Sequence, residues 1–223
     1  MSIKLLNDPE WRLNNLYRIV DKNGNSVPFQ LNDIQQQVLK GLHNRNLILK
    51  ARQVGLSTFS VLYILDQAIF NSNTSCGIVS YSLEHAQHIF KRIIGHALDH
   101  LRDYAQPFVE ILQRSAREIT FGNGSFLRVD TTLRGGSYQN ILVSEFGKTC
   151  ARNPLKAEEV VTGTLQTVPI NGKIIIESTA EGSSGYFAEM VTSAYLRGNE
   201  DLSKAEYKLF FFPWFSELQY SIK

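Results

Sequence analysis

Residues 47–60 read LILKARQVGLSTFS, and this stretch decides the fold of the chain. It begins as an apolar run, passes through a short polar turn with one glycine, Gly55, and continues into an amphipathic segment. This order predicts a strand, a tight turn and the start of a helix. Such a turn presents backbone N–H groups and the positive end of a helix dipole to an anion. The stretch therefore predicts a phosphate-binding turn, with an ordinary strand-to-helix turn as the alternative interpretation.

The turn matches the phosphate-binding loop pattern GxxxxGK[ST] only in part. Gly55 and Ser57 occupy the positions of the second glycine and of the hydroxyl residue. Lys50 stands in place of the first glycine, and Leu56 in place of the lysine. An arginine can hold phosphate oxygens through two parallel donors, whereas a lysine acts as a point charge. We therefore expect Lys50 or Arg52, on the entering side of the turn, to replace the missing lysine.

The composition of the whole chain excludes several classes of protein. Its 223 residues allow a sizeable hydrophobic core, and 43% apolar and 20% charged residues are typical of soluble globular domains. A formal charge of +2 is too small to indicate nucleic acid by itself, so any DNA contact must come from a local patch. Cys76 and Cys150 form no disulfide framework or metal motif, and no apolar run reaches the ~20 residues of a membrane span. We expect a soluble, cytoplasmic α/β domain.

Apolar runs and turn residues predict the other elements. Further strands are expected at residues 76–80, 118–121, 126–129, 141–143, 173–176 and 207–212, and helices at 9–17, 32–43, 56–70 and 84–104. Gly122-Asn123-Gly124 between two of the strands indicates an inserted β-hairpin. The alternation of strands and helices predicts a mainly parallel central sheet flanked by helices.

Two predicted strands end in polar or small residues that suit phosphate chemistry. Residues 140–147 read NILVSEFG, an apolar strand that delivers Ser144 and Glu145 at its carboxyl end, where ligands of open α/β sheets bind. A carboxylate there can orient and deprotonate water, so Glu145 is the candidate base, with a helix-capping or surface glutamate as the alternative. The next strand leads into Ser178, Thr179 and Ala180, whose hydroxyls can contact a phosphate or its attacking water, unless they form only a small-residue turn.

In this order the motifs resemble the N-terminal ATPase domain of the large terminase subunit, the DNA-packaging motor of tailed bacteriophages. Residues 29–35 match the adenine-side glutamine motif, 50–58 a deviant Walker A, 141–145 the Walker B and 178–180 the coupling motif. The resemblance implies a P-loop NTPase fold of the RecA and helicase-like kind. It also implies one ATPase domain over residues 1–223, with residues 1–28 as an N-terminal helical extension and without the family's C-terminal nuclease domain.

The resemblance implies roles for individual residues. Gln35 would contact adenine, with Gln30 as a second candidate, and the turn would hold the phosphates. The implied ATP-binding residues are Gln30, Gln35, Lys50, Arg52, Gln53, Val54, Gly55, Leu56, Ser57 and Thr58. Ser57 would ligate Mg²⁺. Ser178, Thr179 and Ala180 would couple hydrolysis to DNA movement.

Three further residues would carry the catalysis. Glu145 would activate water. Arg134, within LRGGS, lies where similar motors place an arginine finger that acts on a neighbouring subunit, a group that can contribute ~10³–10⁵ in rate. Its alternative role is a contact to backbone or DNA phosphate. Ser144 replaces the Walker B aspartate, and its hydroxyl would bind Mg²⁺, directly or through water, less strongly than a carboxylate. A neighbouring subunit could complete such a site.

The resemblance thus implies a motor that uses ATP and Mg²⁺ to translocate double-stranded DNA into a procapsid. Its partners would be the portal protein, the small terminase subunit and further copies in a ring, in the host cytoplasm and without a membrane. Two alternatives stay open. One is a helicase-like P-loop ATPase, and the other is a hydrolysis-impaired nucleotide-binding assembly module, which Leu56 and Ser144 favour.

Two histidine pairs have spacings that share one helix face, namely His85 with His88 and His96 with His100. No third ligand stands at a suitable spacing for zinc. We interpret these histidines as a solvated helix face.

Overall fold

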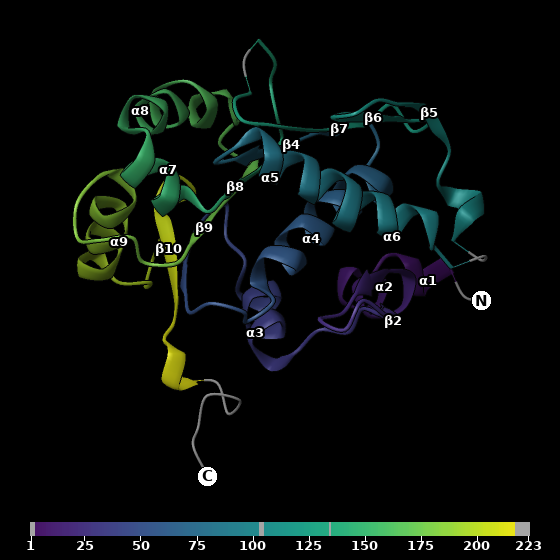
Figure 1. The fold of residues 1–223 in the computed structure, drawn as a ribbon, viewed down its shortest axis with the longest axis horizontal. Helices are drawn as coiled ribbons and strands as arrows, with labels where there is room; N and C mark the ends of the chain where they lie inside the picture. Colours follow the sequence, from purple (N-terminus) through teal and green to yellow (C-terminus); the bar gives the residue numbers. More distant parts are fainter. Residues whose placement is uncertain (1–2, 103–104, 134, 217–223) are drawn as a thin grey trace.

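A computed structural model of the chain describes residues 3–102, 105–133 and 135–216 (Figure 1). Arg134, the predicted arginine finger, lies outside the described residues. Among the described helices, each is too short or too polar to cross a membrane.

An eight-stranded sheet runs through the molecule in the order β10-β3-β9-β8-β4-β7-β6-β5. The strands are β3 (Arg45–Lys50), β4 (Ser75–Ser80), β5 (Ile111–Arg114), β6 (Glu118–Phe121), β7 (Phe126–Asp130), β8 (Asn140–Ser144), β9 (Lys173–Ser178) and β10 (Tyr207–Phe212). From β10 to β7 neighbouring strands pair in parallel, whereas β6 and β5 add antiparallel at one edge. The predicted mainly parallel α/β fold is confirmed. The predicted hairpin is β6–β7, and it extends this sheet.

Helices cover both faces of the sheet. They are α1 (Ile3–Leu6), α2 (Pro9–Leu16), α3 (Asp33–Gly41), α4 (Leu56–Phe70), α5 (Leu83–His88), α6 (His96–Asp99), α7 (Phe146–Arg152), α8 (Pro154–Thr162) and α9 (Tyr186–Arg197). Figure 1 shows α7, α8 and α9 together on one side of β8 to β10, with α3 and α4 on the other. Three short 3-10 turns, at Gln106–Phe108, Thr164–Thr167 and Trp214–Ser216, and a π-helical segment, Ile89–Gly95, complete the described helical segments.

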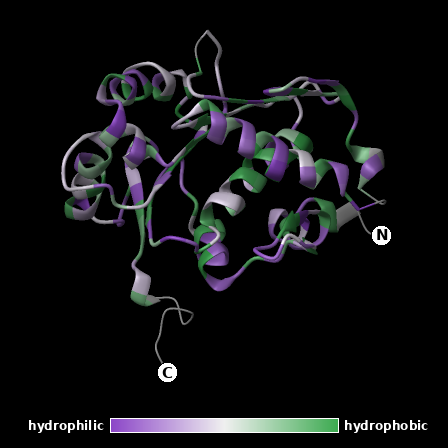
Figure 2. Ribbon diagram, in the orientation of Figure 1, coloured by the Kyte–Doolittle hydropathy of each residue, from purple (hydrophilic) through white to green (hydrophobic). Residues whose placement is uncertain are grey.

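Alternate residues of the same strands feed two separate hydrophobic cores. Ile48 and Leu142 belong to the core on the α4 side, whereas their neighbours Leu47 and Val143 belong to the core on the α7 side. Parallel strands covered on both faces are apolar at successive positions, which explains why these strands are continuous apolar runs. Helix α4 is almost entirely buried, and Figure 2 shows it largely in hydrophobic colours. The phosphate-type turn therefore leads into the most enclosed helix of the fold.

The N-terminal segment is only partly helical, which corrects the expected helical extension over residues 1–28. Helix α2 ends at Leu16, and β1 (Arg18–Val20) then pairs antiparallel with β2 (Ser26–Pro28). The connecting turn is held by Asp21 Oδ1, which accepts hydrogen bonds from the backbone N–H groups of Asn23 and Asn25. This Asx-type turn stabilises a hairpin in place of a helix.

The long helix expected at residues 84–104 also differs from a regular α-helix. Helix α5 passes into a π-helical segment, Ile89–Gly95, before α6 ends at Asp99. Such segments are rare, and no pattern in the local sequence indicates this one.

Candidate functional site

Three polar side chains continue the α4 face of the sheet at the carboxyl ends of its central strands. Ser144 pairs in register with Glu177, and Glu177 pairs with Ile48 on its other side. Paired residues of neighbouring strands point to the same face, and residues two apart along a strand do so too. Lys50, two residues beyond Ile48, therefore joins Ser144 and Glu177 in one polar layer above the apolar core.

The layer is held together by charge. Lys50 Nζ lies 3.0 Å from Glu177 Oε2 and 3.3 Å from Glu145 Oε1, and Ser144 Oγ donates a 2.7 Å hydrogen bond to Glu177 Oε1. All four side chains are buried. Burial lowers the pKa of Lys50, but the two carboxylates outweigh this effect and leave the pKa above its usual value. Lys50 is therefore a buried ammonium shared between two acids.

Glu145 occupies a strained position between β8 and α7. Its φ of 55° and ψ of 44° are left-handed, a conformation that a non-glycine residue adopts at a cost of about 1–2 kcal/mol. Among the described residues only Gln53, Asn73, Glu145 and Asp201 are non-glycine residues with positive φ. Gln53 and Glu145 both line the same cavity, and strained residues concentrate at functional sites.

The second oxygen of Glu145 also meets a lysine. Oε2 lies 2.9 Å from Lys148 Nζ, on the first turn of α7. Burial raises the pKa of Glu145, yet Lys50 and Lys148 together lower it below its usual value. The carboxylate is therefore charged, with a lysine at each oxygen.

These charges border a cavity of about 480 Å³. Its lining consists of Lys50, Arg52, Gln53, Val54, Gly55, Leu56, Ser57, Thr58, Glu145, Lys148 and Thr179. The volume lies within the range of about 300–1,000 Å³ that small-molecule sites occupy. Nine of the predicted site residues from the turn, from β3 and from the end of β8 thus share one cavity with Thr179 of the predicted coupling motif.

The turn at the edge of this cavity suits an anion. Gly55 has a φ of 75°, in the left-handed region that favours glycine, and a Cβ added there would lie 2.7 Å from Gln35 Nε2. No side chain caps the start of α4, and the first N–H groups of a helix have no partner within the helix. Because Gly55 to Thr58 line the cavity, these donors and the helix dipole favour a phosphate there.

Gln35, the predicted adenine contact, braces this turn. Its Oε1 accepts from the Asn32 backbone N–H at 3.0 Å, and its Nε2 donates to the Gly55 carbonyl at 3.0 Å. The first bond completes a capping box with the Asn32 side chain. Gln30, the second candidate, is exposed and does not line the cavity. The adenine contact of either residue stays a prediction.

Packing explains why Leu56 stands where the phosphate-binding loop pattern has a lysine. Leu56 is fully buried and packs in the core on the α4 side, although it borders the cavity. Lys50 brings a cation to the cavity from the end of β3, whereas Arg52 lies exposed on the turn. Of the two proposed replacements, Lys50 is thus the buried one.

The predicted coupling residues connect β9 to α7. Ser178 Oγ is buried and accepts a 3.0 Å hydrogen bond from the Gly147 backbone N–H. A Cβ on Gly147 would lie 2.8 Å from this oxygen, so only glycine allows the close approach. Thr179 lines the cavity and donates a 3.4 Å bond to Glu181, while Ala180 is exposed. The end of β9 therefore touches the helix that follows Glu145.

The side-chain oxygens that line the cavity are suitable ligands for a magnesium ion bound together with a nucleotide. Mg²⁺ is usually bound by one or two protein oxygens together with substrate phosphates and water. Ser57 in the first turn of α4 and the carboxylate of Glu145 both line the cavity. The hydroxyl of Ser144 instead donates to Glu177 and is buried outside the cavity lining, so its role as a ligand stays a prediction.

Sequence reasoning missed Glu177, Lys148 and the environment of His85. His85 is half-buried, which contradicts its interpretation as part of a solvated face. Its Nδ1 lies 2.7 Å from Ser80 Oγ, and burial lowers its pKa to about 4. Its ring also lies against that of Tyr81, with centroids 4.8 Å apart. A charged residue in an apolar run, as in IIIE at 174–177, was the one available signal for Glu177.

Comparison with solved structures gives the same fold. The large terminase ATPase domain of Thermus phage P74-26 matches with a TM-score of 0.65 and 14% identity over 82% of this chain and 81% of that one. The large terminase of bacteriophage HK97 matches with a TM-score of 0.68 and 15% identity over 87% of this chain and 41% of that one. No family model and no curated protein matches the sequence. The resemblance to phage large terminase ATPase domains is therefore confirmed at the level of the fold.

Proposed function

We propose that this chain is the ATPase motor domain of a phage large terminase, which hydrolyses ATP to move double-stranded DNA into a procapsid. One observation carries the proposal: Glu145 and the anion-binding turn at Gly55 border the same cavity. The terminase-type fold supports it. A fold with an acid opposite a phosphate turn has the two parts that nucleotide hydrolysis requires.

The residues divide the chemistry between them. The first amides of α4, Lys50 and Arg52 bind the phosphates and offset their charge. Glu145 orients a water molecule and accepts its proton as the water oxygen bonds to the γ-phosphorus and the bond to the bridging oxygen breaks. Mg²⁺, held by Ser57 and the phosphates, would neutralise charge on the phosphate oxygens. Ser178 and Thr179 would transmit loss of the γ-phosphate to α7, because Ser178 is bonded to Gly147.

The partners belong to the same proposal. A translocating motor contacts DNA mainly through backbone phosphates, since it must act on every sequence. Further copies in a ring, the portal protein and the small terminase subunit would complete the machine in the host cytoplasm. Arg134 would act on the nucleotide of a neighbouring copy.

A second candidate is an assembly module that binds nucleotide without hydrolysing it. The two lysines beside Glu145 favour this candidate, because two neighbouring cations lower the proton affinity of the carboxylate and weaken it as a base. A helicase-like ATPase is the third candidate, and strand separation would identify it.

The test compares Glu145→Gln with the matched surface variant Glu84→Gln in assays of ATP binding and phosphate release. Glu84 is exposed on α5, away from the cavity lining. We expect Glu145→Gln to bind ATP and to release phosphate about 10²–10⁴ times more slowly, with Glu84→Gln unchanged. Stimulation of the wild type by double-stranded DNA of any sequence supports the motor. A wild type that binds ATP without releasing phosphate supports the assembly module, and absence of ATP binding refutes both.

A further inference from the structure

In the nucleotide-free site, two lysines beside Glu145 reduce its strength as a base. Each oxygen of this carboxylate faces a lysine, Oε1 at 3.3 Å from Lys50 and Oε2 at 2.9 Å from Lys148. A general base needs an oxygen within hydrogen-bond distance of the water whose proton it takes. Each carboxylate oxygen of Glu145 can accept a further hydrogen bond, but the two lysines lower its affinity for a proton, so departure of one lysine would make Glu145 the stronger base.

The two lysines differ in their freedom to leave. The Lys50 side chain is 5% exposed and is held by Glu177 as well as by Glu145. The Lys148 side chain is 26% exposed, borders the cavity and has Glu145 as its carboxylate partner. Its Nζ also lies 5.3 Å from the centre of the Tyr81 ring, a contact that tolerates movement of the ammonium. Lys148 is therefore the lysine that can change partners.

A bound triphosphate would supply the competing anion. Its terminal phosphate carries more charge than a single carboxylate and offers several acceptor oxygens to an ammonium. We propose that Lys148 is a further substrate-binding residue, which pairs with Glu145 in the nucleotide-free site and moves to the terminal phosphate of a bound nucleoside triphosphate. The inference rests on the proposed nucleotide site and adds a device that distinguishes triphosphate from diphosphate.

This exchange links substrate binding to activation of the base. When Lys148 leaves, Glu145 Oε2 becomes free to accept a hydrogen bond from water, while Lys50 keeps the carboxylate in place through Oε1. A nucleoside diphosphate lacks the terminal group and leaves the pair between Glu145 and Lys148 intact. A merely structural ion pair on this partly exposed lysine would contribute little and would not depend on the ligand.

The first experiment measures binding of ADP and of a non-hydrolysable ATP analogue, with Mg²⁺, by calorimetry. Lys148→Met removes the charge and keeps the length of the side chain. Lys40→Met is the matched control, because Lys40 also pairs with a glutamate, Glu10, on the surface and away from the cavity. We expect Lys148→Met to weaken the analogue about tenfold and ADP less than about twofold, the size of one charge-assisted contact, with Lys40→Met unchanged.

Equal weakening of both nucleotides, or of neither, would overturn the inference while leaving the nucleotide site intact. Failure of the wild type to bind either nucleotide would overturn the proposed function itself. A second measurement needs no variant and so does not depend on its folding. Labelling of Lys148 by an amine-reactive reagent, read by mass spectrometry, should slow with the analogue relative to ADP. The same labelling rate with both ligands would contradict the transfer.

Discussion

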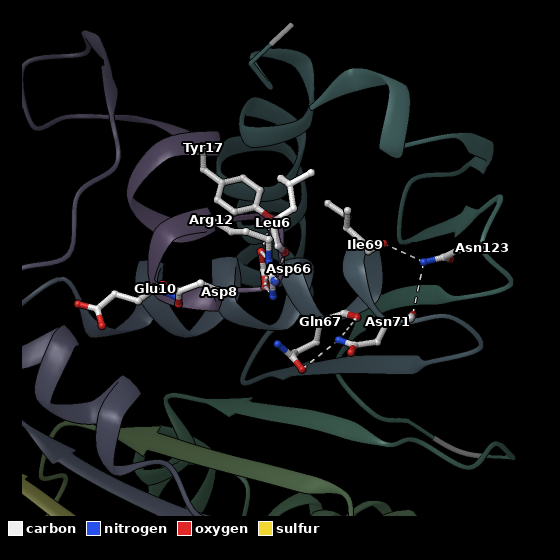
Figure 3. A network of polar contacts seen from close by, with 10 residues as sticks. All are labelled: Leu6, Asp8, Glu10, Arg12, Tyr17, Asp66, Gln67, Ile69, Asn71 and Asn123. Atoms are coloured by element: carbon white, nitrogen blue, oxygen red, sulfur yellow. Dashed lines mark hydrogen bonds and ion pairs between the residues drawn. The ribbon is translucent and has the colours of Figure 1, made fainter. Parts of the chain in front are cut away.

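Two clusters of buried charge lie on helix-covered parts of this fold, and they are built on opposite plans. Figure 3 shows the first, in which Arg12 of α2 and Tyr17 meet Asp66 of α4. The second surrounds Glu145 at the carboxyl ends of the central strands. The first, the closed cluster, is buried and pairs one cation with one anion. The second, the open cluster, borders a cavity, and its members Lys50 and Glu145 each pair with two oppositely charged side chains.

The closed cluster satisfies its carboxylate completely. Arg12 Nε and Nη2 donate to the two oxygens of Asp66 at 2.9 and 2.6 Å, and the Tyr17 hydroxyl donates at 2.8 Å. Asp66 is fully buried, and the Arg12 guanidinium also lies 4.5 Å from the centre of the Phe70 ring. Burial and the neighbouring Asp66 raise the pKa of Tyr17 well above its usual range, so its hydroxyl stays protonated and donates.

The open cluster leaves its partners exchangeable. Lys50 forms ion pairs with Glu145 and Glu177, and Glu145 forms ion pairs with Lys50 and Lys148. Loss of Glu177 leaves Lys50 paired with Glu145, and loss of Lys148 leaves Glu145 paired with Lys50. The comparison indicates that a closed cluster holds elements together, here α2 to α4, whereas a shared cluster beside a cavity can change partners when an anion arrives.

The largest effect is expected from Arg12→Met, which leaves the Asp66 carboxylate buried without its cation. Removing one member of a buried ion pair costs about 3–5 kcal/mol, and we expect a loss of that size in the free energy of unfolding. Urea denaturation followed by circular dichroism measures it. ATP affinity of the folded fraction should stay unchanged, because Arg12 lies outside the cavity lining.

A double variant, Arg12→Met with Asp66→Leu, is the control. Apolar replacement of both partners of a buried pair is often neutral, so most of the lost stability should return. If Arg12→Met lowers the free energy of unfolding by less than about 1 kcal/mol, this ion pair is no stronger than a surface pair. The contrast between the two clusters would then be refuted.

The second effect is expected from Glu177→Gln in the open cluster. Lys50 keeps Glu145 as its partner, and the amide oxygen can still accept from Ser144, so the loss of stability should be smaller, about 1–3 kcal/mol. The cluster also becomes more positive, and ATP affinity should be kept or increase. Urea denaturation and a fluorescent-nucleotide titration measure the two quantities. A loss as large as that of Arg12→Met would show that this cluster is closed as well.

The contrast between the clusters also explains what the sequence could predict. Apolar runs followed by polar residues located β3, β8 and β9 and placed Glu145 and the turn at one edge, because parallel strands end together. Glu177 was missed because its neighbours Ser144 and Lys50 lie far away in the chain, and only the register of three strands brings them together. Lys148 stands three residues after Glu145, but the sequence does not show that both side chains border the same cavity.

Strand β5 and the π-helical segment escaped prediction for different reasons. Strand β5 is exposed at every position, so its sequence lacks the alternation that marks a half-buried strand. No local pattern distinguishes the π-helical segment from a regular helix. A strand of this sheet can be predicted from its sequence where at least one of its faces is buried.

A third effect concerns the pH dependence of the open cluster. The pKa of His85 is lowered from 6.5 to about 4, chiefly by burial; Glu145 opposes this shift, whereas His88, Lys148 and Lys50 add to it. Between these pH values the unfolded chain binds a proton that the folded chain does not. His85 therefore favours the folded state fully above pH 6.5, and this stability is lost as the pH falls toward 4.

The measurement compares unfolding of the wild type and of His85→Gln in urea at several pH values. The difference in free energy between pH 7 and pH 4 should be smaller in the variant by about 1–2 kcal/mol, once the solvent screening of a half-exposed ring is allowed for. Parallel pH curves would show that His85 is as solvated as the sequence indicated.

The smallest effect should come from Gln35→Ala, which tests whether neutral hydrogen bonds hold the open site as the ions do. The variant loses the capping-box bond to Asn32 and the bond to the Gly55 carbonyl, each worth about 1 kcal/mol. If Gln35 braces the turn, ATP and GTP should lose affinity equally, about five- to tenfold, because the phosphates bind to the same amides in both. If it reads adenine, the loss should be confined to ATP. Since both polar groups of the Gln35 side chain already bond to the protein, we expect equal losses, and a loss specific to ATP would mean that nucleotide binding rearranges the turn.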